Sequence, residues 1–485
     1  MRFSFRRIGF LIIAGFIAPL ALSAAEVQAQ SCTHYASPTG NGVGTSASSP
    51  FKIANFWPLA KPGYTLCLLD GKYSGADSMI NPPQNLSGTS SARITVKALN
   101  DGKVTIDGRG TSRPVRLLYN NYFVLEGFNA ANSAASVIAL EKSGYNIIRR
   151  VAAWDAADNN TNIFGIHGGP HNLFEDVAGW GIARKIFSTS QGGNYTTIRR
   201  AWGRWDGSHV IGPKSTFEMA YNSYNMIVEN SIGSWSGERM QKTYTLLNNY
   251  GKPWTGNGAG TYSDYTVNQP RAIFTISALA DDKNAHTKLL GSIAYARSSD
   301  RFAPSYAVFA GKIDSVEVAN TVVYIQPGTH TSKKRFSLNN LSTAVGVNLI
   351  ARNLTGVGGN GSTYGSDWKR SFISEGASLT SVANPFTSTS GADICHRYKD
   401  GSLTSEPLWP WPMNQRIINA MIESGRTAVD ITKTVESMFG PIPAGCSGGS
   451  SSVTSSTTSS STTTTTSSNT IITPPTSPVN LLVAP

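Results

Sequence analysis

Short apolar segments recur through the middle of the chain, and each one ends in polar or charged residues. Their central positions are Leu125, Ile148, Phe174, Ile198 and Val228, followed further on by Leu289, Val318 and Ile350. The first four steps are 23, 26, 24 and 30 residues. A unit of this length holds only a few short strands and cannot bury a core by itself. The pattern therefore predicts stacked coils that share parallel sheets and one apolar interior, with insertions at the turns where a step is long.

Three segments near the N-terminus make the prediction more specific. Lys61–Gly75 has the pattern of a turn, a short strand and a second turn. It lies between Tyr35–Gly42 and Val104–Gly108, with Ser49-Pro50-Phe51 also preceding it. In this order the segments resemble the N-terminal cap and first coils of secreted right-handed parallel β-helix proteins of the pectate-lyase-like superfamily. The resemblance implies an all-β fold, a single-stranded right-handed parallel β-helix (solenoid) with an N-terminal cap, and a polysaccharide as the substrate class.

The pattern changes toward the C-terminus. Apolar residues at helical spacing predict a helix over Asn414–Ser424, and Asp430 is expected to cap a second helix that ends near Gly440. We expect this small C-terminal helical segment to pack on the β-helix or close its end. Residues 447–473 are nearly all Ser and Thr and cannot bury enough apolar surface to fold. Residues 474–485 resemble the opening strand of a fibronectin type III module, which indicates a truncated chain or a vestige.

The first residues have the features of a secretory signal. Arg2, Arg6 and Arg7 precede the apolar run Ile8–Leu22, and Val27-Gln28-Ala29 fits a small-residue cleavage site. No other stretch is apolar enough to cross a bilayer. We therefore expect a secreted protein with no membrane attachment after cleavage. The expected organisation is a signal peptide over 1–29, a β-helix domain over 30–407, the helical segment over 408–446, a disordered linker over 447–473 and the start of a fibronectin-like module over 474–485.

The net charge narrows the class of binding partner, and the cysteines predict disulfides. The chain carries a formal net charge of +12, and a basic exported protein is suited to acidic polymers because opposite charges raise encounter rates. Dense Lys/Arg runs are absent, which together with export argues against nucleic acid. We expect an extracellular or cell-wall polysaccharide as partner, and a monomer. Four cysteines allow three pairings, of which Cys32–Cys67 and Cys395–Cys446 are the most local and are predicted.

The resemblance also implies a catalytic groove on one parallel sheet. Carried over by position, its strands are Ser136–Leu140, Asn162–Gly168, Ile182–Ser188 and Gly207–Gly212. Side chains alternate along a strand, so inward Ile166, Ile186 and Val210 leave His167, Lys185 and His209 facing outward. Strict alternation would send Arg184 inward together with Ile186. Exposing both Arg184 and Lys185 therefore requires a bulge.

Cations with few acids facing them suit β-elimination of a uronic acid polymer. That reaction removes the proton next to a carboxylate, which Arg or Ca²⁺ must first neutralise. A Lys crowded by other cations has a lowered pKa and can take the proton. We therefore predict Lys185 as base, Arg184 as carboxylate clamp, and His209 or Lys214 as helper. A solvated basic face that discourages aggregation is the competing interpretation.

Further residues are assigned binding roles. Predicted sugar contacts are His167, Trp205, Asp206, Trp254 and Tyr262, the last two within a Tyr-, Gly- and Asn-rich insertion over roughly Gly237–Arg271. Asp155 and Asp158 offer two oxygen ligands for Ca²⁺, although loop acids that cap turns are the simpler interpretation. Trp154, Trp180, Trp202 and Trp235 are expected to form a buried aromatic ladder.

Two alternatives to a polysaccharide lyase stay open. A glycoside hydrolase needs two carboxylates on one face, for which the candidates are Asp155, Asp158, Asp206 and Glu218. Gly165-Ile166-His167-Gly168 is faintly similar to the G-H-G of polygalacturonases, but the paired Asp-Asp and R-I-K of that family are not in the expected places. The second alternative is a non-catalytic glycan-binding or adhesive β-helix.

Overall fold

The chain folds as a right-handed parallel β-helix. The computed structural model describes residues 31–241, 243–263, 271–277, 286–301, 303–311, 315–339, 348–388 and 390–447. The predicted signal peptide over 1–29, the fibronectin-like segment over 474–485 and all but the first residue of the predicted linker lie outside the described residues.

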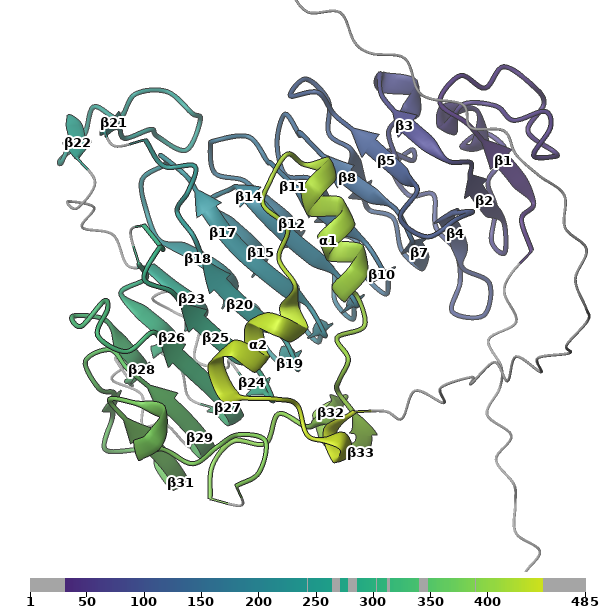
Figure 1. Ribbon diagram of the computed structural model, residues 1–485. Helices are drawn as coiled ribbons and strands as arrows, with labels where there is room; N and C mark the ends of the chain where they lie inside the picture. Colours follow the sequence, from purple (N-terminus) through teal and green to yellow (C-terminus); the bar gives the residue numbers. More distant parts are fainter. Residues whose placement is uncertain are drawn as a thin grey trace, which may run out of the picture. The chain divides into compact units, whose positions relative to one another are not determined.

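Each central coil contributes one strand to each of three parallel ladders, which are joined coil to coil (Figure 1). The first ladder contains β1 (His34–Ala36), β2 (Thr65–Leu68), β4 (Ile94–Ala98), β7 (Phe123–Glu126), β10 (Ile147–Arg149), β13 (Leu173–Glu175), β16 (Thr197–Arg199), β19 (Ile227–Glu229) and β24 (Thr287–Leu290). The second contains β3 (Gly71–Tyr73), β5 (Val104–Asp107), β8 (Asn129–Ala131), β11 (Ala152–Trp154), β14 (Ala178–Ile182), β17 (Trp202–Gly207), β20 (Ile232–Trp235) and β25 (Ile293–Ala296). These two ladders merge in the long strands β27 (Ser315–Ile325), β29 (Asn348–Val357) and β31 (Lys369–Gly376).

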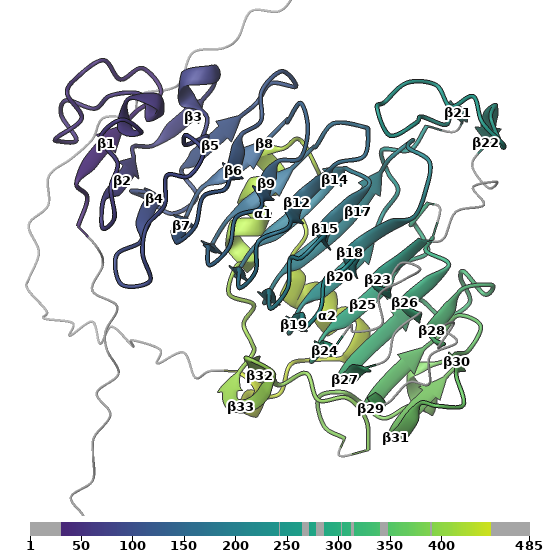
Figure 2. The same cartoon turned by 180° about the vertical axis from the view of Figure 1, so that it is seen from behind.

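The third ladder, which we call the site sheet, is a separate nine-stranded sheet within the described residues (Figure 2). Its strands are β6 (Val115–Leu118), β9 (Ile138–Glu141), β12 (Asn162–His167), β15 (Lys185–Ser190), β18 (Lys214–Ala220), β23 (Arg271–Ser277), β26 (Tyr306–Gly311), β28 (Lys334–Leu338) and β30 (Thr363–Tyr364). Two antiparallel hairpins stand apart, formed by β21 (Thr243–Thr245) with β22 (Thr261–Ser263) and by β32 (His396–Lys399) with β33 (Ser402–Pro407). Short 3₁₀ turns cover Ile53–Phe56, Ala76–Ser78, Leu379–Ser381 and Ala444–Cys446.

The repeat predicted from apolar spacing is the first ladder. The register aligns Leu125, Ile148, Phe174, Ile198, Val228, Leu289 and Val318, all of them buried. The last expected member is wrong by one residue, because Val318 pairs with Ala351 and Ile350 pairs with Glu317. A single residue in left-handed backbone conformation follows these strands in successive coils, such as Arg150, Asp176 and Arg200. This one-residue bend turns the chain from the first ladder into the second.

The site sheet departs from simple alternation at its start. A Cβ added to Gly179, inside the coil, would lie 3.2 Å from the Ile163 side chain and 3.1 Å from that of Phe164, so both side chains point inward. Ile186 and Phe187 of the next coil are likewise both buried. The rings of Phe164 and Phe187 stack with their centroids 4.7 Å apart. With Ile186 inward, Lys185 faces outward, whereas Arg184 precedes β15 and is not subject to the alternation of that strand.

The C-terminal segment packs on the second ladder, away from the site sheet (Figures 1 and 2). Helix α1 (Asn414–Glu423) and helix α2 (Ile431–Phe439) follow the predicted spacing, and the Asp430 side chain accepts a hydrogen bond from Lys433 N–H. Beneath the helices lies a ladder of buried indoles, in which Trp154 stacks on Trp180 at 5.2 Å. Trp180 Nε1–H donates to Ser424 Oγ at 3.1 Å. The expected core role of the tryptophan ladder is therefore confirmed for this part.

Both predicted disulfides are present. Cys32–Cys67 joins the chain ahead of β1 to β2, and Cys395–Cys446 ties the last hairpin to the end of the helical segment. Disulfides of this kind are typical of exported proteins. Among the described residues, the helices are too short and too polar to cross a membrane.

Candidate functional site

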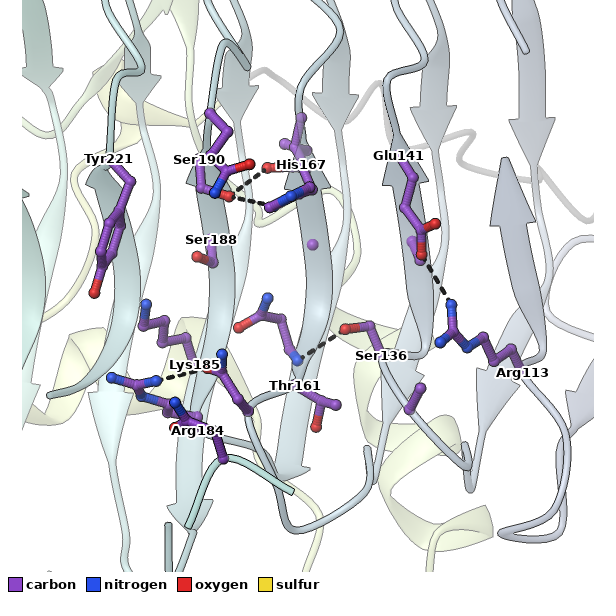
Figure 3. Close-up of a pocket in the computed structure, with 18 residues that line it drawn as sticks. Arg113, Ser136, Glu141, Thr161, His167, Arg184, Lys185, Ser188, Ser190 and Tyr221 are labelled. Carbon is purple, nitrogen blue, oxygen red and sulfur yellow. Dashed lines mark hydrogen bonds and ion pairs between the residues drawn. The ribbon is translucent and has the colours of Figure 1, made fainter. Parts of the chain in front are cut away.

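A polar cavity of about 670 Å³ opens on the outer face of the site sheet (Figure 3). Its floor spans strands β9, β12 and β15, and its rim includes the loop before β12 and Asn249 of the insertion. Asn160 N–H donates to Asn249 O at 3.2 Å, which joins those two rim segments. The lining is dominated by hydroxyls, amides and cations, a set that suits a sugar chain better than an apolar ligand.

Arg184 and Lys185 lie side by side at the lower end of this cavity, and both line it. Arg184 Nη1 donates to Asn160 Oδ1 at 2.6 Å, and its Nε donates to Pro213 O at 3.2 Å. Both acceptors are neutral, so these bonds orient the guanidinium without cancelling its charge. The two residues are 8% and 5% exposed, so each cation is held largely out of bulk water.

Lys185 has a distinctive electrostatic environment. Its ammonium forms an ion pair with the Glu218 carboxylate of the next coil and lies 4.7 Å from the centroid of the Tyr221 ring. Burial lowers the pKa of Lys185, and the charge of Arg184 lowers it further, while Glu218 acts in the opposite direction. Ser188 Oγ donates to Glu218 Oε2 at 3.3 Å, which helps to hold that carboxylate.

The opposite end of the cavity holds a second group of charges. Glu141 accepts from Arg113 at 2.8 Å and from Arg116 at 2.7 Å. Although burial opposes the shift, the hydrogen bonds and charges of Arg116 and Arg113 lower the pKa of Glu141. His167 lies between the two ends, exposed and facing the cavity as predicted, with Nδ1 3.0 Å from Ser190 Oγ. At both ends, therefore, two cations face one carboxylate.

The structure thus brings Lys185, Arg184 and His167 together, but the predicted fourth groove strand is wrong. The strand that continues the site sheet beyond β15 is Lys214–Ala220, and Gly207–Gly212 instead ends β17 and forms a loop. His209 lies on that loop and pairs through Nδ1 with Asp158 Oδ2 at 2.5 Å. Lys214 is buried, and its Nζ donates to Val210 O at 2.5 Å. Neither residue lines the cavity, so neither helper role fits this geometry.

Trp205 and Asp206 are also misplaced by the prediction. Trp205 is 1% exposed, its Nε1–H donates to Ala183 O at 2.9 Å, and its ring stacks on Trp235 inside the core. Asp206 is fully buried and accepts from Arg204 at 2.6 Å and 3.0 Å. Because both are inaccessible to a glycan, the prediction that they contact sugar is wrong.

Of the remaining assignments, Trp254 does not line the cavity. Trp254 is partly buried against the core, and its Nε1–H donates to Asn257 O at 3.0 Å. Tyr262 lies in β22, but its side chain is outside the described residues. The predicted lip is therefore represented at the cavity by Asn249 alone among its described residues.

The two aspartates suggested as calcium ligands already have side-chain partners. Asp155 accepts from Arg426 Nη2 at 2.8 Å and 2.9 Å, and Asp158 pairs with His209. Within the described residues no three His, Cys, Asp or Glu side chains gather in a way that could hold a metal ion. This donor set does not fit Ca²⁺ at Asp155 and Asp158, and the calcium prediction stays untested.

Sequence reasoning missed several residues of the cavity. They are Arg113, Ser136, Glu141, Asn160, Asn162, Ser188, Ser190, Gln191 and Tyr221. The signal that finds them is the phenylalanine that recurs in these strands, because Phe164, Phe187, Phe217 and Phe274 share one register position. Aligning the coils on this ring places Gly165, Ser188 and Glu218 in one outward row.

Comparisons with known proteins found solved structures of low sequence identity, but no matching family and no matching curated sequence. Among solved structures, pectate lyase Pel9A is 14% identical with a TM-score of 0.44, covering 80% of this chain and 90% of its own. An alginate lyase from Paenibacillus sp. str. FPU-7 is 13% identical with a TM-score of 0.37, over 71% and 99% of the two chains. A rhamnogalacturonan lyase is 12% identical with a TM-score of 0.41, over 77% and 95%.

Proposed function

We propose that this protein is a secreted polysaccharide lyase that cleaves a uronic acid-containing glycan by β-elimination. The observation that carries the proposal is the pair Arg184–Lys185, held side by side at the end of an accessible polar cavity. Elimination removes the proton on C5, next to the carboxyl carbon of the uronate, and it needs a charge partner for that carboxylate and a base for that proton.

The chemistry follows from the surroundings of each residue. Arg184 bonds only to neutral oxygens in its pairings with Asn160 and Pro213, so its charge is available to a substrate carboxylate. Burial lowers the pKa of Lys185, and the charge of Arg184 lowers it further, which favours the neutral amine that a base requires. A buried lysine with a shifted pKa in a cleft is typical of a catalytic base. An adhesive surface does not require such a residue.

Hydrolysis fits this cavity less well. A glycosidase needs one carboxylic acid with a raised pKa and a second carboxylate free to act as base or nucleophile. Glu141 is held by two arginines that lower its pKa, and Glu218 is paired with Lys185. Of the other candidates, Asp206 is fully buried, and Asp155 and Asp158 pair with Arg426 and His209 outside the cavity.

The decisive experiment is a screen of the purified protein against pectate, alginate, chondroitin and neutral glycans. A lyase releases unsaturated uronates that absorb in the ultraviolet, whereas a hydrolase releases reducing ends without that absorbance.

Lys185→Ala should reduce elimination by a factor of about 10² to 10⁴, the usual contribution of a positioned base, while glycan binding persists. The matched control is Lys433→Ala on helix α2, whose side chain is 81% exposed on the far side of the molecule. Glycan binding without either product would favour the adhesive alternative.

A further inference from the structure

Tyr221 is a cavity residue whose position is fixed by its backbone and by the adjacent coil. It follows β18 directly and adopts a left-handed backbone with φ +54°, which is unfavourable for a residue with a Cβ. Its carbonyl accepts the N–H of Gln191 from the adjacent coil at 2.5 Å, which holds the turn in place. The ring is thereby directed back over the site sheet.

The phenol and the Lys185 amine face the same space. Lys185 Nζ lies 4.7 Å from the Tyr221 ring centroid, and the Tyr221 hydroxyl points down along the strands toward Lys185 (Figure 3). The charged groups around this ring are Lys185, Glu218 and Arg184. Burial raises the pKa of Tyr221 and the Glu218 charge raises it further, while Arg184 opposes this, so the hydroxyl keeps its proton at neutral pH.

β-Elimination needs a proton at the leaving oxygen as well as a base at carbon. The lining of the cavity offers hydroxyls on Ser136, Thr161, Ser188, Ser190 and Tyr221. A phenol, with an ordinary pKa of about 10, is a far better proton donor than an aliphatic hydroxyl. Tyr221 is also the hydroxyl residue in contact with the proposed base.

We propose that Tyr221 is the general acid that protonates the departing glycosidic oxygen, an inference that rests on the proposed lyase function. The neutral amine of Lys185 takes the proton from C5, and the electrons of that C–H bond form the C4–C5 double bond. The bond from C4 to the glycosidic oxygen breaks, and that oxygen takes the proton of the Tyr221 hydroxyl. The lysine ammonium then returns its proton to the tyrosine phenolate, which restores both residues without any outside reactant.

The ring contributes separately from the hydroxyl. When Lys185 becomes an ammonium during the reaction, the face of the Tyr221 ring stabilises that charge. Removing only the hydroxyl therefore tests the acid, and removing the whole ring tests both contributions.

The test compares Tyr221→Phe with the intact protein on whichever of polygalacturonate, alginate or chondroitin the latter degrades. We expect kcat to fall by about 10² to 10⁴, with KM nearly unchanged and the basic limb of the pH profile lost. The unfolding midpoint should stay unchanged, because the ring still packs on Lys185. Tyr195→Phe is the control, since Tyr195 is 47% exposed in a turn outside the cavity.

The possible outcomes separate the two proposals. If Tyr221→Phe keeps its kcat and its basic limb while Lys185→Ala is inactive, the acid role of Tyr221 is overturned and the lyase proposal stands. If Lys185→Ala and Tyr221→Phe both remain fully active, the base and acid roles are both overturned while the lyase activity stands. If the intact protein eliminates none of the three polymers, the proposed function fails and this inference fails with it.

Discussion

Two clusters of charged residues in this protein differ in how their charges are balanced. We call the first the Arg426 corner, which consists of Arg204, Arg239, Arg426, Asp155, Asp206 and Glu238 on the second ladder and the C-terminal segment. Three arginines there meet three carboxylates. In the cavity, Arg184 and Lys185 face one carboxylate, Glu218, and Arg113 and Arg116 face one carboxylate, Glu141.

The difference separates structure from function. A cluster whose charges balance needs no further partner, and Arg426 uses it to dock the C-terminal segment onto the β-helix. A cluster with excess positive charge that opens to solvent is ready to accept anions. The excess positive charge therefore predicts that an acidic glycan binds at the cavity. Mutations should then act mainly on stability at the Arg426 corner and on binding or catalysis at the cavity.

The largest expected effect is on stability at the corner. Arg204→Ala leaves the fully buried Asp206 without its bidentate partner, because Arg204 donates to it at 2.6 Å and 3.0 Å. Breaking a buried pair from one side costs about 3–5 kcal/mol of unfolding free energy. Denaturant unfolding measures the loss, and Arg204→Met/Asp206→Leu should recover most of it. A loss well below about 1 kcal/mol would show that the corner does not depend on charge pairing.

The next effect concerns Asp300, which lies beside the corner. Burial raises the pKa of Asp300 to about 6, against the opposing influence of the Arg297 N–H and side chain and of Arg204. The folded protein therefore holds this proton more tightly than the unfolded chain, and the favourable contribution is complete below pH 3.8 and is lost as pH rises through about 6. At pH 7, Asp300→Asn should raise the unfolding free energy by up to about 3 kcal/mol.

Measuring Asp300→Asn across pH checks the sign as well as the size. The stabilisation should shrink as pH falls and vanish near pH 3.8, where the native side chain is already neutral in both states. A stabilisation that is equal at all pH values would contradict the linkage, since it would then come from packing.

A smaller effect is expected where the corner and the cavity meet. Burial raises the pKa of Asp158, but the hydrogen bonds and charge of His209 and the hydrogen bond of Ser208 outweigh this and lower it. The stability from this carboxylate is therefore present above pH 3.8 and is lost as pH falls below it, through the depressed folded value. At pH 7, Asp158→Asn should cost about 1–3 kcal/mol because the groups that bond the carboxylate lose a charged acceptor.

Asp158→Asn also tests whether Asp158 helps to position the rim of the cavity. Asp158 lies two residues before Asn160, which orients Arg184. We expect a modest rise in KM and little change in kcat, whereas a variant that changes kcat alone would argue against a positioning role. The matched control is Asp430→Asn, the cap of helix α2 on the opposite side.

These predictions depend on details that the sequence reveals only in part. Leu125, Ile148, Phe174 and the related positions are spaced regularly enough to predict coils, because apolar burial on one ladder imposes a period. The helices and both disulfides follow from local signals such as the Asp430 cap and the distances between cysteines. These features can be predicted because each depends on residues close together in the sequence or on one apolar position that recurs in each coil.

The site was harder to predict because outward residues carry no periodic constraint. Equating Ile166 with Ile186 shifted one coil by three positions, since the register places Ile166 opposite Thr189. Equating them with Val210 moved the next groove strand onto a loop. Lys185 and Arg184 both line the cavity, because Arg184 precedes β15 and is not subject to the alternation of that strand. Glu218 was considered only as a hydrolase acid, because nothing in the sequence places it next to Lys185.

The smallest expected effect concerns Glu218, the carboxylate that pairs with Lys185 and partly balances the charge of the cavity. Glu218→Gln removes the group that holds the pKa of Lys185 up, leaving burial and Arg184 to lower it further. The acidic limb of the kcat/KM profile, which reports the base of the free enzyme, should therefore move to lower pH. Glu126→Gln, which removes the partner of Arg149 on the first ladder, should leave the limb in place. If the limb of Glu218→Gln moved to higher pH or stayed where it was, Lys185 would not be the titrating base, and the excess charge of the cavity would serve binding alone.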